Sequence, residues 1–380
     1  MSVTTTDVLV IGGGTMGTAT GWALARGGHR VIVLEQFTHI HAFGSHGGKT
    51  RIFRHAYAEG EQYVPWTLEA DRLWSELQER QTPQFMFRCG GLDISSSDGE
   101  WAHQARASAV HYGIEHEWLN GAEVNARFPA WNLPADWSAC FDPAAGFLDV
   151  EPALRALASE MIAAGGELRP GEQVISWGES SHGVTVKTDK DDYAADKLVI
   201  TAGAWSEKVM AGLGLPLDVR RKPVFWFEPK DESLFKPERF PVFVADVGSD
   251  EFYGLPQYAG PGIKSGVHSG GHSVNPDAIN REIQDDDLSP SYRAFLHDCF
   301  KGLSDRVVDS AVCMYTLTPD EHFLIDRYPG RERVAFASGF SGHGFKFTPV
   351  VGEYLATLVT VDRADVLPFF SYERLLGTPR

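Results

Sequence analysis

The N-terminal segment contains the pattern that most restricts how this chain can fold. Residues 7–11 are a short apolar run, typical of a strand buried on both faces of a parallel sheet. The run leads directly into Gly12-Gly13-Gly14-Thr15-Met16-Gly17, which has the spacing GxGxxG. A helix is predicted over residues 18–26, and a second strand over residues 29–34 ends at Glu35. This order of elements predicts the first βαβ unit of a dinucleotide-binding α/β domain.

The glycines of this turn have separate physical tasks. Gly12 permits the tight turn, Gly14 lets the backbone approach a pyrophosphate, and Gly17 lets the helix pack closely on the strand. The N-terminus of the helix presents free N–H groups and the positive end of its dipole to phosphate. Glu35 lies 23 residues after Gly12, where an acidic side chain can accept a hydrogen bond from a ribose hydroxyl. The alternative is a glycine-rich turn that serves only packing.

Two distant segments distinguish FAD from NAD, which share this fingerprint. The sequence holds no second GxGxxG after a strand, which favours a single dinucleotide. Residues 196–205 are an apolar strand that ends in a turn of small residues, and residues 334–337 are another such strand. The second strand leads into the glycine-rich residues 338–346 and a helix predicted over residues 349–360. A helix N-terminus at that position favours a flavin, whose pyrimidine end gains negative charge on reduction.

Composition and charge limit the partners. Of the 380 residues, 43% are hydrophobic and 22% are charged, as in an ordinary globular protein, and no apolar run reaches the length of a membrane span. The N-terminus lacks the basic region of an export signal, so we expect a cytoplasmic location. The net charge of −17 disfavours nucleic acids and anionic membranes as partners. A site for a carboxylate substrate must therefore carry local positive charge.

The cysteines and histidines do not form a metal motif. The four cysteines, Cys89, Cys140, Cys299 and Cys313, are scattered without a CxxC pair, and the sequence contains no HExxH. We therefore expect neither a metal site nor a disulfide framework. Taken alone, Cys313 would be interpreted as a small buried apolar residue.

Taken together, the motifs resemble those of the monomeric sarcosine oxidase and N-methyltryptophan oxidase family, which is related to D-amino-acid oxidase. The resemblance runs nearly from end to end. It is most specific in six segments that occur in the order of the family, namely residues 45–57, 252–256, 262–264, 277–282, 313–316 and 341–347.

The resemblance implies a cofactor and a set of site residues. It implies FAD, held covalently through an 8α-S-cysteinyl bond to Cys313. It also implies that Arg54 and Lys346 bind the substrate carboxylate and that Lys264 lies beneath the flavin, where oxygen is activated. By the same resemblance, the flavin and substrate are surrounded by Arg51, Tyr253, His268 and Tyr315. The expected cofactor contacts are Gly12, Gly14, Met16, Gly17, Glu35, Ser45, Thr50, Val174, Gly203, Trp205, Cys313, Met314, Gly342, Gly344 and Phe345.

Simpler interpretations exist for most of these side chains. Arginines in a loop are usually solvated, and Lys264 could be a strand lysine that faces water. His268 could be a core histidine, and Tyr253 and Tyr315 could be core aromatics with bonded hydroxyls. An ammonium at Lys346, between two phenylalanines, would be costly to desolvate unless an anion paired with it.

The chain departs from the family pattern at three positions. Gly47 and Lys49 stand where members of the family often have histidine and aspartate, which removes an imidazole and reverses a charge. Val244 stands where methionine is expected in members specific for sarcosine. These departures affect the prediction of the substrate more than the prediction of the cofactor.

The predicted fold is α/β, with a discontinuous Rossmann-like FAD-binding domain and a substrate domain built on a mainly antiparallel sheet. The first would comprise residues 1–85, 150–220 and 310–380, and the second residues 86–149 and 221–309.

The predicted enzyme is a monomeric flavoprotein oxidase. It would oxidise a secondary (N-methyl) amino acid such as sarcosine to an imine, which water hydrolyses to an aldehyde and an amino acid, while dioxygen becomes hydrogen peroxide. Three alternatives stay open: a dehydrogenase that uses another electron acceptor, an oxidase of a larger or cyclic secondary amino acid, and a non-enzymatic FAD-binding module.

Overall fold

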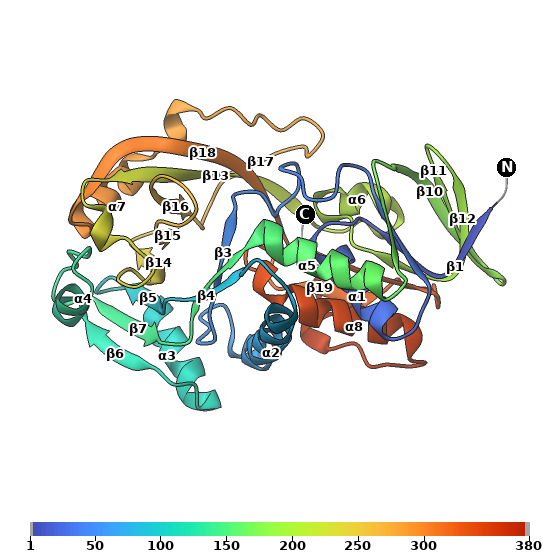
Figure 1. The fold of residues 1–380 in the computed structure, drawn as a ribbon, viewed down its shortest axis with the longest axis horizontal. Coiled ribbons are helices and arrows are strands. Elements are labelled where there is room, and N and C mark those ends of the chain that lie inside the picture. Colours follow the sequence, from blue (N-terminus) through green and yellow to red (C-terminus); the bar gives the residue numbers. More distant parts are fainter. Residues whose placement is uncertain (1–2, 377–380) are drawn as a thin grey trace.

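The structure, a computed structural model, describes residues 3–376, so the first two residues of the N-terminal segment lie outside it. The described chain forms two large sheets at opposite ends of an elongated molecule, with helices packed around them (Figure 1). Helices longer than one turn are α1 (Thr15–Arg26), α2 (Val64–Arg80), α3 (Trp101–Tyr112), α4 (Gly121–Arg127), α5 (Val150–Ala163), α7 (Pro290–Cys299) and α8 (Thr348–Thr360), and a single turn forms α6 (Ser206–Val209).

The first sheet is built on parallel strands and contains the predicted βαβ unit. Its eight strands within residues 3–376 are β1 (Thr4–Ile11), β2 (Val31–Glu35), β9 (Glu167–Pro170), β10 (Val174–Ser180), β11 (Gly183–Thr188), β12 (Asp192–Ile200), β19 (Leu324–Arg327) and β20 (Val334–Ser338). The order is β10-β11-β12-β1-β2-β9, and β20 pairs in parallel with the last residues of β12. Strand β1 lies between β12 and β2, parallel to both.

Strand β1 is apolar in its second half because both faces of the sheet are covered. Val8 and Val10 belong to the core on the side of α1, α5 and α8, which lie together across one face (Figure 1). Leu9 and Ile11 belong to a second core on the opposite face. Helix α1 begins at Thr15, three residues before the predicted start, because Gly14 is its N-cap and the carbonyl of Gly14 accepts the first helical hydrogen bond.

The second sheet is mainly antiparallel. Its nine strands in the described chain are β5 (Gly91–Ser95), β6 (Glu117–Asn120), β7 (Ser138–Asp142), β13 (Asp218–Pro229), β14 (Val242–Val247), β15 (Asp250–Leu255), β16 (Ile263–Val267), β17 (His272–Ser273) and β18 (Leu303–Leu317). Strands β13 and β18 pair over most of their length and arch from this sheet toward the first domain (Figure 1). The predicted fold class is confirmed. Strand β18 crosses the boundary predicted at residue 310, and the domain limits stay a prediction.

A small third sheet lies between the two large ones. Strand β8 (Gly146–Asp149) pairs with β3 (Thr50–Phe53) on one side and with β4 (Met86–Arg88) on the other. The antiparallel pairing brings β3, which follows the glycine-rich residues 44–48, against the start of α5. Between Val3 and Leu376, no helix combines the length and hydrophobicity needed to cross a membrane.

Candidate active site

The glycine turn after β1 has the shape that a bound pyrophosphate requires. Gly12 has a φ of +96°, and a Cβ on it would lie 2.4 Å from the carbonyl oxygen of Thr201. A Cβ on Gly17 would lie 1.8 Å from the carbonyl oxygen of Gly12, so only glycine lets α1 approach the turn. At Gly14, by contrast, a Cβ would meet no atom within 4 Å. The turn is therefore closed on the protein side and open at Gly14.

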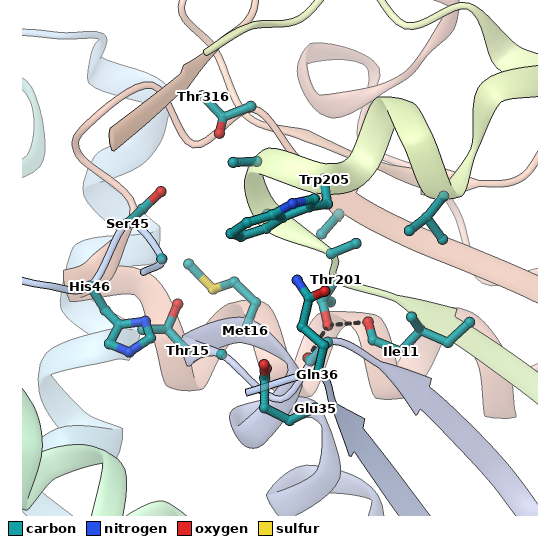
Figure 2. A pocket seen from close by; sticks show the side chains of 18 of the residues that line it. Ile11, Thr15, Met16, Glu35, Gln36, Ser45, His46, Thr201, Trp205 and Thr316 are labelled. Atoms are coloured by element: carbon teal, nitrogen blue, oxygen red, sulfur yellow. Dashed lines mark hydrogen bonds between the residues drawn. The ribbon is translucent and has the colours of Figure 1, made fainter. Parts of the chain in front are cut away.

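The open side of this turn faces a large cavity of about 430 Å³. It runs along the carboxyl ends of the parallel strands, between the N-terminus of α1 and the turn after β12. Figure 2 shows Trp205 across the cavity from Met16, with Glu35 and Gln36 at one end and Ser45 and His46 on another side. The predicted cofactor contacts that line it are Gly12, Gly14, Met16, Glu35, Ser45, Val174, Gly203, Trp205, Met314, Gly342, Gly344 and Phe345.

Three predicted cofactor contacts do not line this cavity. Gly17 lies behind the turn, where it packs on Gly12. Thr50 and Cys313 line a second, smaller cavity described below.

Glu35 keeps its predicted place at the end of β2, where its carboxylate accepts a hydrogen bond from the N–H of Phe37 at 2.8 Å and lies 3.5 Å from His41.

The residues around the large cavity fit FAD. The first N–H groups of α1 have no intrahelical partner and no side-chain cap, and they face the cavity beside Gly14. The hydroxyl of Thr316, at the opposite end in Figure 2, is buried without a hydrogen-bond partner. FAD has a pyrophosphate in its middle and a ring with polar atoms at one end, so it would satisfy both groups. Among residues 3–376, no cluster of histidine, cysteine or acidic side chains is arranged to hold a metal ion.

The second cavity, of about 70 Å³, adjoins the first. Arg51, Tyr315, Gly342 and Phe345 line both cavities. All the side chains predicted for substrate binding and catalysis line the smaller one, namely Arg51, Arg54, Tyr253, Lys264, His268, Tyr315 and Lys346. Most of them come from β3, β15, β16, β18 and the turn before α8, so this cavity lies between the second sheet, the small third sheet and the start of α8.

Lys264 is buried in β16, with 3% of its surface exposed, so the interpretation as a strand lysine that faces water is wrong. Its Nζ donates hydrogen bonds to the carbonyl oxygens of Gly48 and Thr50, both at 2.6 Å. Burial lowers the pKa of Lys264 well below its usual range, and the nearby charge of Arg51 lowers it further. An ammonium has three N–H donors, so one donor is left for a ligand.

Cys313 lies on β18, beside the same backbone segment. A Cβ on Gly48 would lie 3.3 Å from Sγ of Cys313 and 3.5 Å from Nζ of Lys264. A Cβ on Gly47 would lie 3.6 Å from the same sulfur. The two glycines therefore leave room beside Sγ of Cys313, which lines the small cavity, whereas Cys89, Cys140 and Cys299 line neither cavity.

Lys346 and Arg54 are both buried, unlike a typical loop arginine, with 5% and 4% of their surfaces exposed. Nζ of Lys346 donates to the carbonyl oxygen of His343 at 2.8 Å and to the hydroxyl of Tyr57 at 3.2 Å. Burial lowers the pKa of Lys346 to about 7, and Arg54 adds repulsion while Glu59 opposes the decrease.

Arg54 already has two carboxylate partners. Its Nη2 donates to both oxygens of Glu59, at 2.7 and 2.8 Å, and its Nη1 lies 3.2 Å from Oδ1 of Asp93. Burial alone would raise the pKa of Glu59, but Arg54 and other nearby positive charges lower it to about 2. Burial raises the pKa of Asp93 to about 6, although Arg54 opposes the increase. The sequence interpretation missed both acids, because neither residue belongs to a motif that would mark it.

The histidine and tyrosine side chains of the small cavity are uncharged at neutral pH. Burial lowers the pKa of His268 to about 4, and its Nδ1 lies 3.3 Å from the hydroxyl of Tyr315. Burial raises the pKa of Tyr253 and of Tyr315 above that of a free phenol. Gly266 leaves room for Tyr253, since a Cβ there would lie 2.9 Å from the phenolic oxygen.

The departures from the family pattern lie in different places. Lys49 points away from both cavities: it pairs with Asp309 at 2.6 Å and lies 4.7 Å from the centre of the Trp226 ring. Val244 lines the small cavity, where it belongs to an apolar group that includes Trp101. Only the valine can therefore contact a substrate directly.

Comparison with known proteins agrees with the cofactor assignment. Residues 7–358 match the family described as FAD dependent oxidoreductase. Monomeric sarcosine oxidase from Bacillus sp. (strain NS-129) is 37% identical over 365 residues, which cover 94% of each chain. N-methyl-L-tryptophan oxidase from Yersinia pestis (strain Pestoides F) is 32% identical over 371 residues, covering 96% of this chain and 98% of that one.

Solved structures show the same fold. The open form of NikD, an unusual amino acid oxidase essential for nikkomycin biosynthesis, has a TM-score of 0.84 and 25% identity, and covers 97% of this chain and 98% of its own. The resemblance identified in the sequence is thereby confirmed. The chain belongs to the FAD-dependent oxidoreductase family, in the group that includes the sarcosine and N-methyl-tryptophan oxidases.

Proposed function

We propose that this protein oxidises a small secondary amino acid, with sarcosine as the first candidate, and transfers the electrons to dioxygen. The observation that carries the proposal is the small cavity beside the cofactor cavity, in which two buried cations, Arg54 and Lys346, lie at one side and Lys264 at another. The named activities of the sarcosine and N-methyl-L-tryptophan oxidases support the same reaction class.

The size of the cavity favours a small substrate. A buried water needs roughly 10–15 Å³ of such space, so 70 Å³ corresponds to about five to seven waters. Sarcosine is of this size, whereas the indole of an N-methylated tryptophan is much larger. Trp101 and Val244 border the space that a larger side chain would need.

The residues around the small cavity would bind and orient the substrate. The chemistry that FAD supplies when bound is acceptance of a hydride from the C–H beside the amine, followed by reduction of dioxygen to hydrogen peroxide. Lys346 would bind the carboxylate directly, and Arg54 would contribute its charge from the same side. A carboxylate fixed at one end restricts the amine to the other end, toward the large cavity.

The protonation of the amine depends on the charges around it. A substrate amine must lose its proton before its C–H can be transferred as a hydride. Arg51 lines both cavities, and its positive charge on the side of the cofactor cavity disfavours an ammonium there. His268 is uncharged at neutral pH because its pKa is lowered, so it adds no charge that would oppose or favour this loss.

Covalent attachment of FAD through Cys313 is part of the proposal. The position of Sγ beside Gly47 and Gly48, at the small cavity, supports it. Lys264 would assist oxygen reduction, because an ammonium with one free donor stabilises an anion formed from dioxygen. We also propose that the enzyme is a cytoplasmic monomer.

A dehydrogenase with another electron acceptor is the second candidate. L-proline dehydrogenase from P. horikoshii shares the fold, with a TM-score of 0.82 at 22% identity, so the fold is compatible with either acceptor. A panel of secondary amino acids should be added to the anaerobic holoenzyme while its flavin absorbance is followed, and peroxide should be measured in air. We expect sarcosine to bleach the flavin and air to yield stoichiometric peroxide. Bleaching without peroxide would identify a dehydrogenase, and the absence of bleaching by any amine would contradict the proposal.

A further inference from the structure

The guanidinium of Arg54 is unusually well satisfied for a group expected to bind a substrate. Besides both oxygens of Glu59, it donates to the carbonyl oxygen of Ala56 at 3.2 Å. Its flat faces lie near the rings of Tyr57 and Trp101, 4.8 and 5.4 Å from their centres. A substrate carboxylate that approached Arg54 would therefore compete with carboxylates that the protein itself supplies.

Asp93 is the less expected of these two acids. It lies in the middle of β5, between Cys140 on β7 and Val244 on β14, and 1% of its surface is exposed. Burial of a carboxylate among apolar neighbours is unfavourable unless it is paired and hydrogen-bonded. Here the indole N–H of Trp101 donates to Oδ1 at 2.7 Å, and Nη1 of Arg54 lies 3.2 Å from the same oxygen.

The positive and negative charges at this side of the cavity cancel when Lys346 is protonated. Arg54 and Lys346 are opposed by Glu59 and Asp93, and Asp93 acts from behind Arg54 without lining the cavity. The pKa of about 6 for Asp93 leaves it mostly ionised at pH 7, and Lys346, whose pKa is about 7, is protonated there once an anion binds beside it, so the balance holds for the bound state. With an uncharged residue at position 93, the same group would carry one net positive charge.

We propose that Asp93 is a specificity-determining residue that acts through Arg54: it balances the charge of the small cavity, so that a substrate with one carboxylate is accepted and a second carboxylate is disfavoured. This inference rests on the proposed function, because it assumes that the cavity binds the carboxylate of an amino acid. It narrows the substrate class to N-alkyl amino acids whose side chain carries no acid. The residue takes no part in the chemical step and affects only which anions bind.

The test measures anion binding to the holoenzyme at pH 7 through the change in visible flavin absorbance. Acetate serves as the single carboxylate, oxalate as a small dianion and acetamide as the uncharged control. In Asp93→Asn we expect the Kd of acetate to decrease about tenfold, as expected for one charge-assisted contact, and that of oxalate to decrease further. The Kd of acetamide should not change. Asp326→Asn, which neutralises a half-buried carboxylate on β19 outside both cavities, should change none of the three values.

Each outcome decides between this role and a structural one. An Asp93→Asn holoenzyme with native flavin content and native Tm, but with an unchanged or increased Kd for acetate, would overturn the inference. If that variant does not fold, the native enzyme alone gives the answer, because a balanced cavity should bind oxalate no more tightly than acetate. A native enzyme that binds oxalate at least tenfold more tightly would refute the role of Asp93. Failure of acetate to compete with any substrate would instead refute the proposed carboxylate site.

Discussion

The two cavities differ in the kinds of groups that line them. The large cavity lies at the ends of parallel strands and has glycines where the chain must approach a ligand. The small cavity is formed by ionisable side chains from elements far apart in the sequence, and its buried cations are matched by buried acids. The shape of the glycine turn can therefore hold a cofactor common to a whole family, whereas the proposed balance of side-chain charges would select the substrate.

The largest effect should come from altering backbone shape in the large cavity. We expect Gly17→Ala to abolish FAD binding, because its Cβ would lie 1.8 Å from the carbonyl oxygen of Gly12 and force α1 away from the turn. Flavin content per purified chain measures the effect. Gly178→Ala on β10 is the matched control, since a Cβ there would meet only one atom, at 4.0 Å. Normal flavin content in Gly17→Ala would show that the turn tolerates a wider separation than its geometry indicates.

The proposed covalent attachment involves Cys313, which lines the small cavity, and it should be lost completely in Cys313→Ser. Acid precipitation should leave the yellow flavin in the pellet of the native protein and release it to the supernatant from the variant, since a serine hydroxyl forms no thioether. Cys89→Ser, at a half-buried cysteine that lines neither cavity, should retain flavin in the pellet. Release of all flavin from the native protein would exclude the covalent bond.

The next largest effect should come from a change in the small cavity, and it should slow the reaction with oxygen rather than the oxidation of the amine. In Lys264→Met, reoxidation of the reduced enzyme should slow by about 10²–10³, the typical contribution of one preorganised donor. Anaerobic reduction should change much less, because hydride transfer from the substrate creates no anion at this position. Stopped-flow absorbance follows the two steps separately. Lys49→Met is the control, since Lys49 also lies beside Trp226 but outside both cavities. Reoxidation at the native rate would favour the dehydrogenase.

The smallest effect should be a pH dependence of anion binding that the large cavity does not share. Lys346 has a pKa of about 7 without ligand, and a bound anion should raise it. Below pH 7 the lysine is protonated in both states and contributes no pH dependence, whereas protonation of Asp93 near pH 6 should lower the Kd of acetate. Above pH 7 binding requires uptake of a proton, and the Kd should increase by up to about tenfold per pH unit. Acetate has no amine, so its titration reports the site alone.

The variant Lys346→Met should bind acetate more weakly at pH 6 and show a flat profile above pH 7, because it has no group to protonate. A native profile that is also flat would show that Lys346 does not contact the anion. A slope that persists in the variant would assign the titration to another group.

The sequence was most informative where function depends on local geometry. Gly12, Gly14 and Glu35 belong to one continuous βαβ unit, so their positions around a dinucleotide follow from strand and helix geometry alone. The predictions for Thr50 and Cys313 were less complete. Both were expected among the cofactor contacts, yet they line the smaller cavity. Their positions depend on the pairing of β3 with β8 and of β18 with β13, which joins segments far apart in the sequence.

The amino-acid sequence by itself determined the FAD-binding unit, the fold class and the cations needed for a carboxylate. Only the tertiary structure decided how those cations are neutralised. Glu59 follows Arg54 by five residues and Asp93 lies on a different sheet, yet both carboxylates contact the same guanidinium. The physical reason is that electrostatic interactions depend on distance through space and on burial, and neither quantity is encoded in a local motif.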